Sequence, residues 1–416
     1  MKIAIIGSGI SGLGSAYLLN KDHDITVYEK NEYIGGHSRT VEVGVDNKNV
    51  PVDTGFIVFN DRNYPNLVGL FEHLKVPVVK SDMSFGVSID QGWLEYGTRR
   101  PLDLFAQKSN FFRPKFWKML ADLLKFNAKA KNYLASDLSM GACLEELKVG
   151  EWFRDYYLLA MGASIWSTPA VGMLDFPASR FIRFFDNHGL LTISDQPQWY
   201  TVAGGSQEYV KRISAAFINK IKLDCEIEKV IRESNQVIVI DTEGNRASYD
   251  QVVFACHSDQ ALKILDAPTP AEQEIIGAIH YQANEMVLHS DISFMQKRKN
   301  SWSSWVYLSE ARRDNSQSVS LSYWMNNLQP LATQKPIIVT LNPGRQPAAE
   351  MIYDKYTFRH PLFDKKTVAA QEKLATIQGV DRIWYTGAWQ RYGFHEDGLL
   401  SAVTVAEKMG VTIPWK

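Results

Sequence analysis

Three consecutive titratable residues lie near the end of the sequence, in GFHEDGLLSA between Gly393 and Gly398. The side chains of His395, Glu396 and Asp397 could move protons, ligate a metal ion or line a cofactor pocket. Neighbouring side chains point in divergent directions and no second ligand cluster has suitable spacing, so we predict no metal site. His395 and Glu396 remain candidate acid/base residues, with hydrogen bonding to their own loop as the alternative.

Two further histidines could exchange protons. His188 lies in DNHGLL, which is typical of a loop, and His360 precedes Pro361. Each could equally be a structural histidine held by hydrogen bonds. We take His188 as the third candidate catalytic residue.

A glycine pattern near the beginning of the sequence indicates a turn that binds phosphate. Gly7, Gly9 and Gly12 have GxGxxG spacing, with Ile10 and Ser11 between the last two. The apolar run before them is typical of a buried parallel strand, and the apolar spacing after them is helical. The start of such a helix presents free N–H groups to a pyrophosphate.

The next predicted strand, DITVYE, ends in Glu29 and is followed by Lys30. A carboxylate at this position can accept hydrogen bonds from ribose hydroxyls, and it disfavours a 2′-phosphate. Strand, glycine turn, helix, strand and acid together predict a dinucleotide-binding βαβ unit.

The length, net charge and cysteine content of the chain restrict the classes of function that remain. The chain has 416 residues and a net charge of −1, so no global positive field indicates nucleic-acid binding. Three widely separated cysteines favour neither a disulfide framework nor a zinc site, and they suit a reducing, cytoplasmic location. The opening MKIAIIGSGI predicts a strand rather than a signal peptide, and no run of 18 apolar residues predicts a membrane span.

Several later segments resemble one known superfamily. They are EKNEYIGGHSRT with its Gly35-Gly36 doublet, VPVDTGF, WYTVAGGSQEYVKRI and RIWYTGAWQRYGFHEDGLLSA. In this order they resemble the flavin-dependent amine oxidase, phytoene desaturase and protoporphyrinogen oxidase superfamily. The resemblance implies that the cofactor is FAD.

The same resemblance implies particular cofactor contacts. The expected residues are Gly7, Gly9, Ile10, Ser11, Gly12, Glu29, Lys30, Gly35, Gly36, His37, Ser38, Arg39, Gly55, Phe56, Val230, Gly387, Ala388, Phe394, Asp397, Gly398 and Leu399. Val230 is expected to meet adenine through its backbone, and the helix that begins near Asp397 is expected to point at the pyrimidine edge of the flavin. The sequence departs from the superfamily at His37, where Arg is usual, so either His37 or Arg39 could meet phosphate. It departs again at Ala388, where an acid is usual.

A narrower resemblance covers nearly the full length. Its segments are MGASIWSTP, FFDNHGLL, QWYTVAGGSQEYV, VTLNP, RHPLFD and GAWQRYGFHEDGLLSA. They resemble predicted FAD/NAD-binding flavoproteins found beside cyclopropane-fatty-acid synthases. This resemblance implies modified fatty acids as substrates and a functional link to such a synthase.

The predicted fold is α/β, a doubly wound Rossmann-like FAD domain with an interleaved α+β substrate domain. We assign 1–80, 196–265 and 376–416 to the FAD domain. We assign 81–195 and 266–375 to the substrate domain.

The segment 110–134 combines an apolar face with six basic residues and a single acid. Phe112, Phe116, Met119, Leu120, Leu123 and Leu124 share the predicted helical face. Such a helix could lie on an anionic membrane, which would place the protein at the inner face of the membrane, or it could pack against the core.

The predicted function is an FAD-dependent oxidoreductase that oxidises or desaturates an apolar substrate, such as a fatty acyl chain, by hydride transfer to flavin N5. No second GxGxxG offers a nicotinamide site. The alternatives are an amine oxidase, a flavin-dependent isomerase and a non-catalytic flavoprotein partner of a lipid-modifying enzyme.

Overall fold

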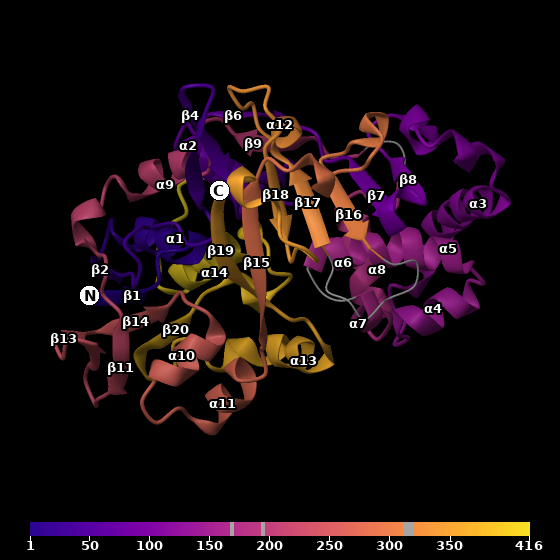
Figure 1. The fold of residues 1–416 in the computed structure, drawn as a ribbon. Helices are drawn as coiled ribbons and strands as arrows, with labels where there is room; N and C mark the ends of the chain where they lie inside the picture. Colours follow the sequence, from indigo (N-terminus) through magenta and orange to yellow (C-terminus); the bar gives the residue numbers. More distant parts are fainter. Residues whose placement is uncertain (167–169, 193–195, 311–319) are drawn as a thin grey trace.

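A parallel sheet of five strands forms the centre of one lobe (Figure 1). In spatial order its strands are β10 (Ile221–Lys222), β2 (Asp24–Tyr28), β1 (Lys2–Ile6), β14 (Gln251–Phe254) and β20 (Ile383–Tyr385). The central runs are apolar on both faces because helices or strands cover both sides of the sheet. The computed structural model describes residues 1–166, 170–192, 196–310 and 320–416.

Two separate cores flank this sheet. One contains side chains of α1 (Ile10–Leu19), α2 (Pro65–His73), α9 (Gln207–Ser214) and α14 (His395–Lys408). The other contains side chains of α10 (Ser258–Ile264), α11 (Pro270–Ile276), α13 (Lys365–Lys373) and the antiparallel strands β11 (Ile227–Arg232), β12 (Val237–Asp241) and β13 (Arg246–Tyr249). The strand β1 contributes to both cores, as its alternating side chains require.

A sheet of seven strands forms the second lobe. In spatial order its strands are β19 (Ile352–Pro361), β15 (Tyr281–His289), β18 (Ile338–Leu341), β17 (Ser320–Trp324), β16 (Trp305–Ser309), β7 (Phe85–Ile89) and β8 (Leu94–Gly97). Helices gather at the β7–β8 end of this sheet (Figure 1). They are α3 (Pro114–Lys129), α4 (Met140–Glu146), α5 (Glu151–Phe153), α6 (Leu159–Trp166), α7 (Ala170–Leu174) and α8 (Ala178–Asn187). Aromatic side chains fill the core between these helices and β7 and β8.

Two small sheets and one short helix complete the connections. β3 (Thr40–Val45) pairs with β4 (Lys48–Asp53), and β9 (Trp199–Val202) lies between β5 (Val58–Asn60) and β6 (Val78–Ser81). The helix α12 (Met325–Leu328) follows β17. Because β9 pairs with strands more than 100 residues earlier, the chain returns to the first lobe after building the α-helical region.

The predicted α/β class, with a parallel Rossmann-like sheet, is confirmed. Every strand of the parallel sheet comes from segments assigned to the FAD domain, and every strand of the seven-stranded sheet comes from 81–195 or 266–375. The domain limits themselves stay a prediction. Residues 167–169, which end the MGASIWSTP segment, lie outside the described residues. In the described part of the chain, no helix has the length and apolarity needed to cross a membrane.

Candidate active site

The carboxyl ends of four parallel strands meet at one edge of the five-stranded sheet. Gly7 follows β1 and Glu29 follows β2. His257 lies three residues beyond β14, and Gly387 two residues beyond β20. Open α/β sheets bind ligands at this edge.

The turn between β1 and α1 forms an open cradle. Gly9 directly precedes α1, and no atom lies within 4 Å of the position that a Cβ would take there. A Cβ on Gly36 would lie 3.0 Å from the Gly9 Cα, and the Gly35 N–H donates to the Ser8 carbonyl at 3.0 Å. The first turn of α1 contains Ile10, Ser11 and Gly12. The two glycine motifs therefore meet at a helix start whose N–H groups lack partners within the helix.

Glu29 connects this turn to the chain beyond β2. Its Oε2 accepts from the Ser8 N–H at 3.0 Å and from the Ser8 hydroxyl at 2.5 Å. Its Oε1 accepts from the N–H and the side-chain amide of Asn31, at 2.9 and 2.7 Å. A ribose hydroxyl would replace or join these four donors, so ribose binding by Glu29 stays a prediction, as does any contact by the exposed Lys30.

Arg39 forms an ion pair that joins the two lobes. Its Nη1 lies 2.6 Å from Oδ2 of Asp354 in β19, and its Nη2 lies 3.3 Å from Oδ1. The guanidinium also lies over the Tyr356 ring at 4.6 Å. Of the two residues that the sequence left open for phosphate binding, His37 is the one without such a partner in the described structure.

His37 belongs to a cluster of three histidines. Its ring centroid lies 5.4 Å from that of His360, 6.2 Å from that of His257 and 4.9 Å from that of Phe358. The side-chain amide of Asn284 donates to His360 Nδ1 at 2.9 Å. His257 Nδ1 is buried and has no hydrogen-bond partner in the described structure. Burial lowers the pKa of His37 to about 4 and the pKas of His257 and His360 to about 3.

This cluster is neutral near pH 7, and its orphan nitrogen indicates a missing partner. Sequence reasoning missed His257 as a site residue. The available signal was its place in QVVFACH, directly beyond a buried parallel strand whose carboxyl end faces the ligand edge.

Gly55 brings the chain after β4 against this region. A Cβ at Gly55 would lie 2.2 Å from the His37 carbonyl oxygen, so a larger residue would force the two segments apart. The Phe56 N–H donates to the same carbonyl at 2.8 Å. The Phe56 ring then stacks on His395, with centroids 3.8 Å apart and planes 11° apart.

His395 is held by two hydroxyl groups. Its Nε2 lies 2.9 Å from Ser38 Oγ and 2.9 Å from the Tyr209 hydroxyl, and these hydroxyls also bond each other. Burial lowers the pKa of His395 to about 3. The network joins the segment after the glycine doublet, α9 and α14. These bonds favour the structural alternative for His395.

Glu396 and Asp397 cap helices. Glu396 is buried and accepts from the N–H of Asn66 at 3.1 Å, the amide of Asn66 at 2.7 Å and the N–H of Leu67 at 2.9 Å, all at the start of α2. Burial raises its pKa. Asp397 accepts from the N–H of Phe394 at 3.0 Å at the start of its own helix, and burial raises its pKa to about 6. Acids at helix starts are stabilising, so both contacts support a structural role.

His188 comes from the second lobe and reaches the C-terminal loop. Its ring stacks on Phe184 at 3.9 Å and lies 5.6 Å from the Phe394 ring. Phe184 and Phe394 also stack on each other at 5.2 Å. Its Nδ1 lies 2.9 Å from the Phe184 carbonyl, which assigns the proton to Nδ1 and leaves Nε2 as an acceptor. Burial lowers the pKa of His188 to about 4.

The remaining predicted contacts lie in well-packed positions. Val230 is fully buried in β11, and its carbonyl accepts from the Asp266 N–H at 2.8 Å, so an adenine contact there stays a prediction. Gly387 donates its N–H to Ser401 Oγ at 2.8 Å. Gly398 faces Ile10 across the contact of α14 with α1, since a Cβ at Gly398 would lie 2.8 Å from Ile10 Cγ2. Two further predicted residues, Ala388 and Leu399, flank this contact, with Leu399 packed close to Gly14.

Sequence reasoning missed one buried acid, Asp53. Asp53 accepts from the N–H and hydroxyl of Ser206, from the Thr40 hydroxyl and from the side-chain amide of Gln329. Burial raises its pKa to about 6. It anchors the turn before α9 to β4 and to the second lobe. Its sequence signal was the VPVDTGF segment, from which Gly55 and Phe56 were predicted as cofactor contacts but Asp53 was not.

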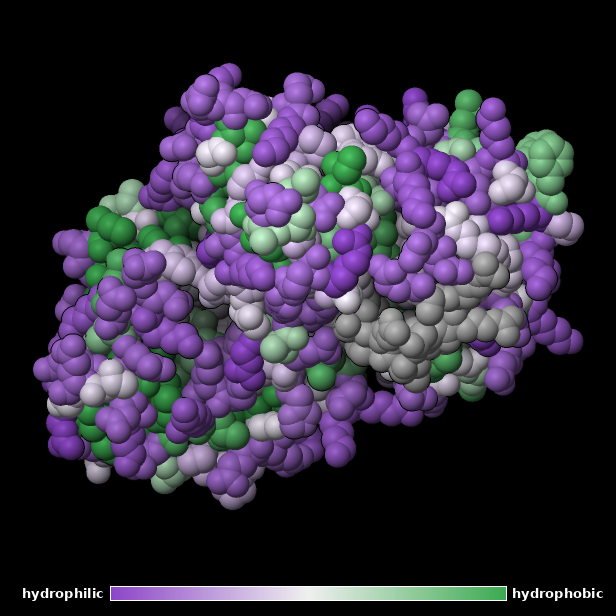
Figure 2. Space-filling view, viewed as in Figure 1, coloured by the Kyte–Doolittle hydropathy of each residue, from purple (hydrophilic) through white to green (hydrophobic). Residues whose placement is uncertain are grey.

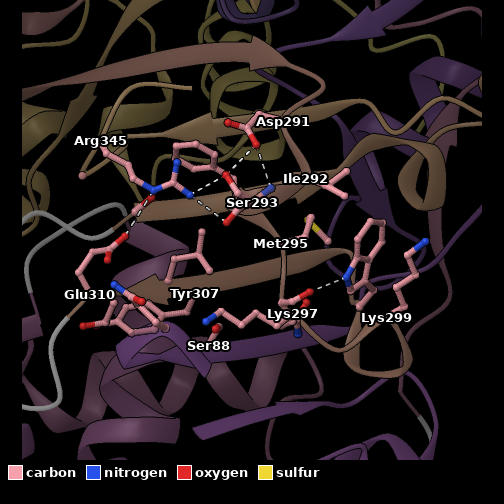
Figure 3. Close-up of a pocket in the computed structure, with 18 residues that line it drawn as sticks. Ser88, Asp291, Ile292, Ser293, Met295, Lys297, Lys299, Tyr307, Glu310 and Arg345 are labelled. Carbon is pink, nitrogen blue, oxygen red and sulfur yellow. Dashed lines mark hydrogen bonds and ion pairs between the residues drawn. The ribbon is translucent and has the colours of Figure 1, made fainter. Parts of the chain in front are cut away.

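A separate pocket of about 620 Å³ lies in the second lobe (Figure 3). Arg345 bonds Ser293 there and lies 3.7 Å from Glu310, as the dashed lines show. None of the residues predicted to contact the cofactor lines it. It is distinct from the edge of the parallel sheet.

The sequence profile described as "Flavin containing amine oxidoreductase" matches residues 10–326. The chain belongs to this family. It is an FAD-dependent oxidoreductase, as the sequence predicted. A search of curated protein sequences finds no match.

Solved structures of low sequence identity share the fold. A CLA-producing fatty acid isomerase from P. acnes is similar, with a TM-score of 0.70 and 16% identity over 98% of each chain. Cyclohexylamine oxidase from Brevibacterium oxydans IH-35A has a TM-score of 0.69 and 14% identity over 98% of this chain and 99% of that one. A putative protoporphyrinogen oxidase from Exiguobacterium sp. 255-15 has a TM-score of 0.65 and 16% identity over 98% of each chain.

The residues at the ligand edge fit the cofactor FAD. The open position at Gly9 leaves space for a phosphate group beside the start of α1. The orphan nitrogen of His257 offers a polar contact that no described protein group uses. The donor set of helix N–H groups and histidines suits a diphosphate. It lacks the acid usual at Ala388, so the cofactor is held without that carboxylate.

Proposed function

We propose that this oxidoreductase oxidises or desaturates an apolar substrate, a fatty acyl chain or a modified lipid. The observation that carries the proposal is the aromatic surroundings of His188, at the junction of the helical region with the C-terminal loop. Tyr392 and Phe394 of that loop pack against the aromatic core of the second lobe. Within the described residues, no carboxylate bonds His188. An apolar chain suits such surroundings better than a charged one.

We assign the role of proton acceptor to His188. Its Nε2 is unprotonated near pH 7, and no described group bonds it. Bound FAD supplies the hydride acceptor at N5. The chain's own contribution is to hold His188 in one tautomer through the Phe184 carbonyl and to exclude water with Phe184, Tyr392 and Phe394. We assign His395 and Glu396 to positioning the loop.

An amine oxidase is less well supported. An ammonium group would need space between aromatic faces. Phe184 and Phe394 stack directly on each other at 5.2 Å, so they leave no such space between them.

An isomerase that acts on the same lipid class without net oxidation is the second candidate. A single neutral histidine could remove a proton at one carbon and return it at another. The similar structure whose title names a fatty acid isomerase agrees with this alternative in fold alone. A cytoplasmic location and a functional link to a cyclopropane-fatty-acid synthase complete the proposal.

The test is an anaerobic visible spectrum of the flavin-loaded protein, before and after phospholipids that carry cyclopropane or methyl-modified acyl chains are added. Loss of the oxidised-flavin band supports lipid oxidation. An unchanged band with a rearranged lipid, detected by mass spectrometry and NMR of the extracted acyl chains, favours the isomerase. An unchanged band with unchanged lipid contradicts both, and would direct attention to amines and to the non-catalytic partner alternative.

A further inference from the structure

Large hydrophobic side chains protrude from one place on the second lobe. Leu102 is 82% exposed, Phe112 81%, Phe111 56% and Trp117 46%. Figure 2 shows hydrophobic residues projecting from the edge of the molecule beside the region of α3. A single exposed hydrophobic residue is ordinary, but a group of this kind indicates an interaction site.

Leu102 and the aromatic side chains come from neighbouring segments, because the turn Pro101–Phe105 contacts the turn Lys108–Phe112. The Phe111 ring lies 5.4 Å from the Phe112 ring and 5.8 Å from the Trp117 ring, and Phe105 lies 5.2 Å from Trp117. The Trp117 indole N–H donates to the Phe111 carbonyl at 2.8 Å, which fixes the turn before α3 against the helix. We call Leu102, Phe111, Phe112 and Trp117 the aromatic tip.

The aromatic tip is not the face by which α3 packs. Phe116, Met119 and Phe126 of α3 are at most 2% exposed and belong to the aromatic core. The predicted apolar face of 110–134 is therefore mainly a packing face. Phe112 and Leu124 are the members of that face that remain exposed. Buried residues already form the packing face of α3, so packing of the core does not account for the exposed side chains of the aromatic tip.

Positive charge surrounds the aromatic tip. Residues 99–118 contain six basic residues and one acid, Asp103. Three of the basic residues pair with acids: Arg99 with Asp82, Arg100 with Asp103 and Lys118 with Asp122. The exposed Lys108 and Lys115 have no acidic partner in the described part of the chain. The surface is thus apolar at its tip and cationic around it.

We propose that the aromatic tip docks the protein on an anionic lipid membrane. Aromatic and leucine side chains insert at the boundary between headgroups and acyl chains, and neighbouring lysines contact anionic headgroups. A protein partner would more usually require a complementary pocket, whereas side chains more than four-fifths exposed suit insertion into a fluid layer. This inference does not depend on the substrate, because the tip lies outside the ligand edge.

The experiment is vesicle flotation of the full-length, flavin-loaded protein, with phosphatidylglycerol/phosphatidylcholine vesicles and with pure phosphatidylcholine vesicles. We expect binding to the anionic vesicles only. The variant L102S/F112S should bind about 100-fold more weakly, because two apolar side chains no longer insert. The variant K108Q/K115Q should bind about 10-fold more weakly, and added salt should remove this difference.

The matched control is I218S/V380S, which changes two side chains that are 55% and 46% exposed on the first lobe. It should bind like the unaltered protein. Absence of binding to anionic vesicles overturns the proposal. Equal binding by L102S/F112S overturns the assignment to this surface. Self-association that L102S/F112S abolishes, without vesicle binding, would identify a second copy of the chain as the occupant instead. Unaltered flavin content and melting temperature in each variant show that the variants are folded.

Discussion

At the scale of single residues, the same side chain has different roles in different surroundings. His395 and His188 both lie close to Phe394, and burial lowers the pKa of each. The Nε2 of His395 is shared by two hydroxyls, whereas that of His188 has no partner in the described structure. The number of hydrogen-bond partners, rather than the residue type, therefore distinguishes a histidine that positions the loop from a histidine that could act as a base.

Substitution of His188 by Gln tests this distinction. If His188 takes a proton from the substrate, H188Q should slow anaerobic flavin reduction by the active lipid about 100-fold, with FAD content unchanged. The matched control is H280Q at an exposed histidine, and it should reduce at the original rate. Stopped-flow spectroscopy gives both rates. Equal rates in H188Q and H280Q would remove the catalytic role.

The pair of Arg39 and Asp354 supports a second prediction. Either R39A or D354A leaves a partly buried charge without its partner, so each should lower the free energy of unfolding by about 2 kcal/mol. The double variant should cost less than the sum. Urea denaturation measures these values. If Arg39 instead binds phosphate, R39A alone should lose FAD, and D354A should not restore it.

At the scale of elements, the cofactor site is assembled from turns and helix starts. The start of α1 meets the glycine doublet, the start of α2 is capped by Glu396, and the start of α9 is anchored by Asp53. Each contact joins segments that are far apart in the sequence. At α2 and α9, N–H groups of the helix start donate to these acids because they have no partners within the helix. At α1 the Gly35 N–H donates to the Ser8 carbonyl instead, so the N–H groups of that helix start stay available.

Replacing Glu396 by Gln separates capping from catalysis. E396Q keeps the shape but loses a charged acceptor for three donors, so unfolding should become easier by about 2 kcal/mol. The rate of flavin reduction per bound flavin should not change. E407Q, at an exposed position of the same helix, is the control and should be neutral in both measurements. If E396Q reduced its flavin much more slowly while its stability stayed unchanged, Glu396 would have a catalytic role.

A methyl group at Gly9 should fill the phosphate cradle. Because space for a Cβ exists there, G9A should fold with nearly unchanged stability while FAD affinity falls at least about 10-fold. G44A has similar free space in β3, away from the ligand edge, and should bind FAD normally. Flavin fluorescence titration gives the affinities. Normal affinity in G9A would place the phosphates elsewhere.

At the scale of the whole molecule, buried histidines connect stability to pH. His37, His257 and His360 stay neutral in the folded protein down to about pH 4 or 3, whereas an unfolded histidine takes up a proton near pH 6.5. Between these values the unfolded state binds more protons, so stability falls as pH falls. Burial also raises the pKas of Asp53, Glu396 and Asp397, and these acids act in the opposite direction. The histidines outnumber them, because burial lowers the pKas of His188, His289 and His395 as well.

The flavin-free protein should therefore lose stability from about pH 6.5 towards pH 4. The variant H257Q should show a shallower decline. Urea midpoints measured across this range provide the test. Stability that rises on acidification in both proteins would show that the carboxyl groups dominate.

The sequence by itself determined the parts of this protein that depend on local spacing. The strand KIAIIG, the glycine turn and the acid after the second strand are contiguous, so their period and order specify a βαβ unit directly. Membership of an FAD-binding family could be predicted from such segments, because each glycine meets a steric requirement of its own turn.

Only the tertiary structure decided which side chains are free to act. Asp354, 315 residues from Arg39 in the sequence, forms an ion pair with it. The carboxylate of Glu396, a candidate acid/base group in the sequence, accepts a hydrogen bond at the start of α2. His257 and His360 could be identified as neighbours of His37 only from the tertiary structure, in which strands from the two lobes bring the three rings together. Partners that are distant in sequence leave no periodic trace, so pairing, burial and pKa emerge only when the chain folds.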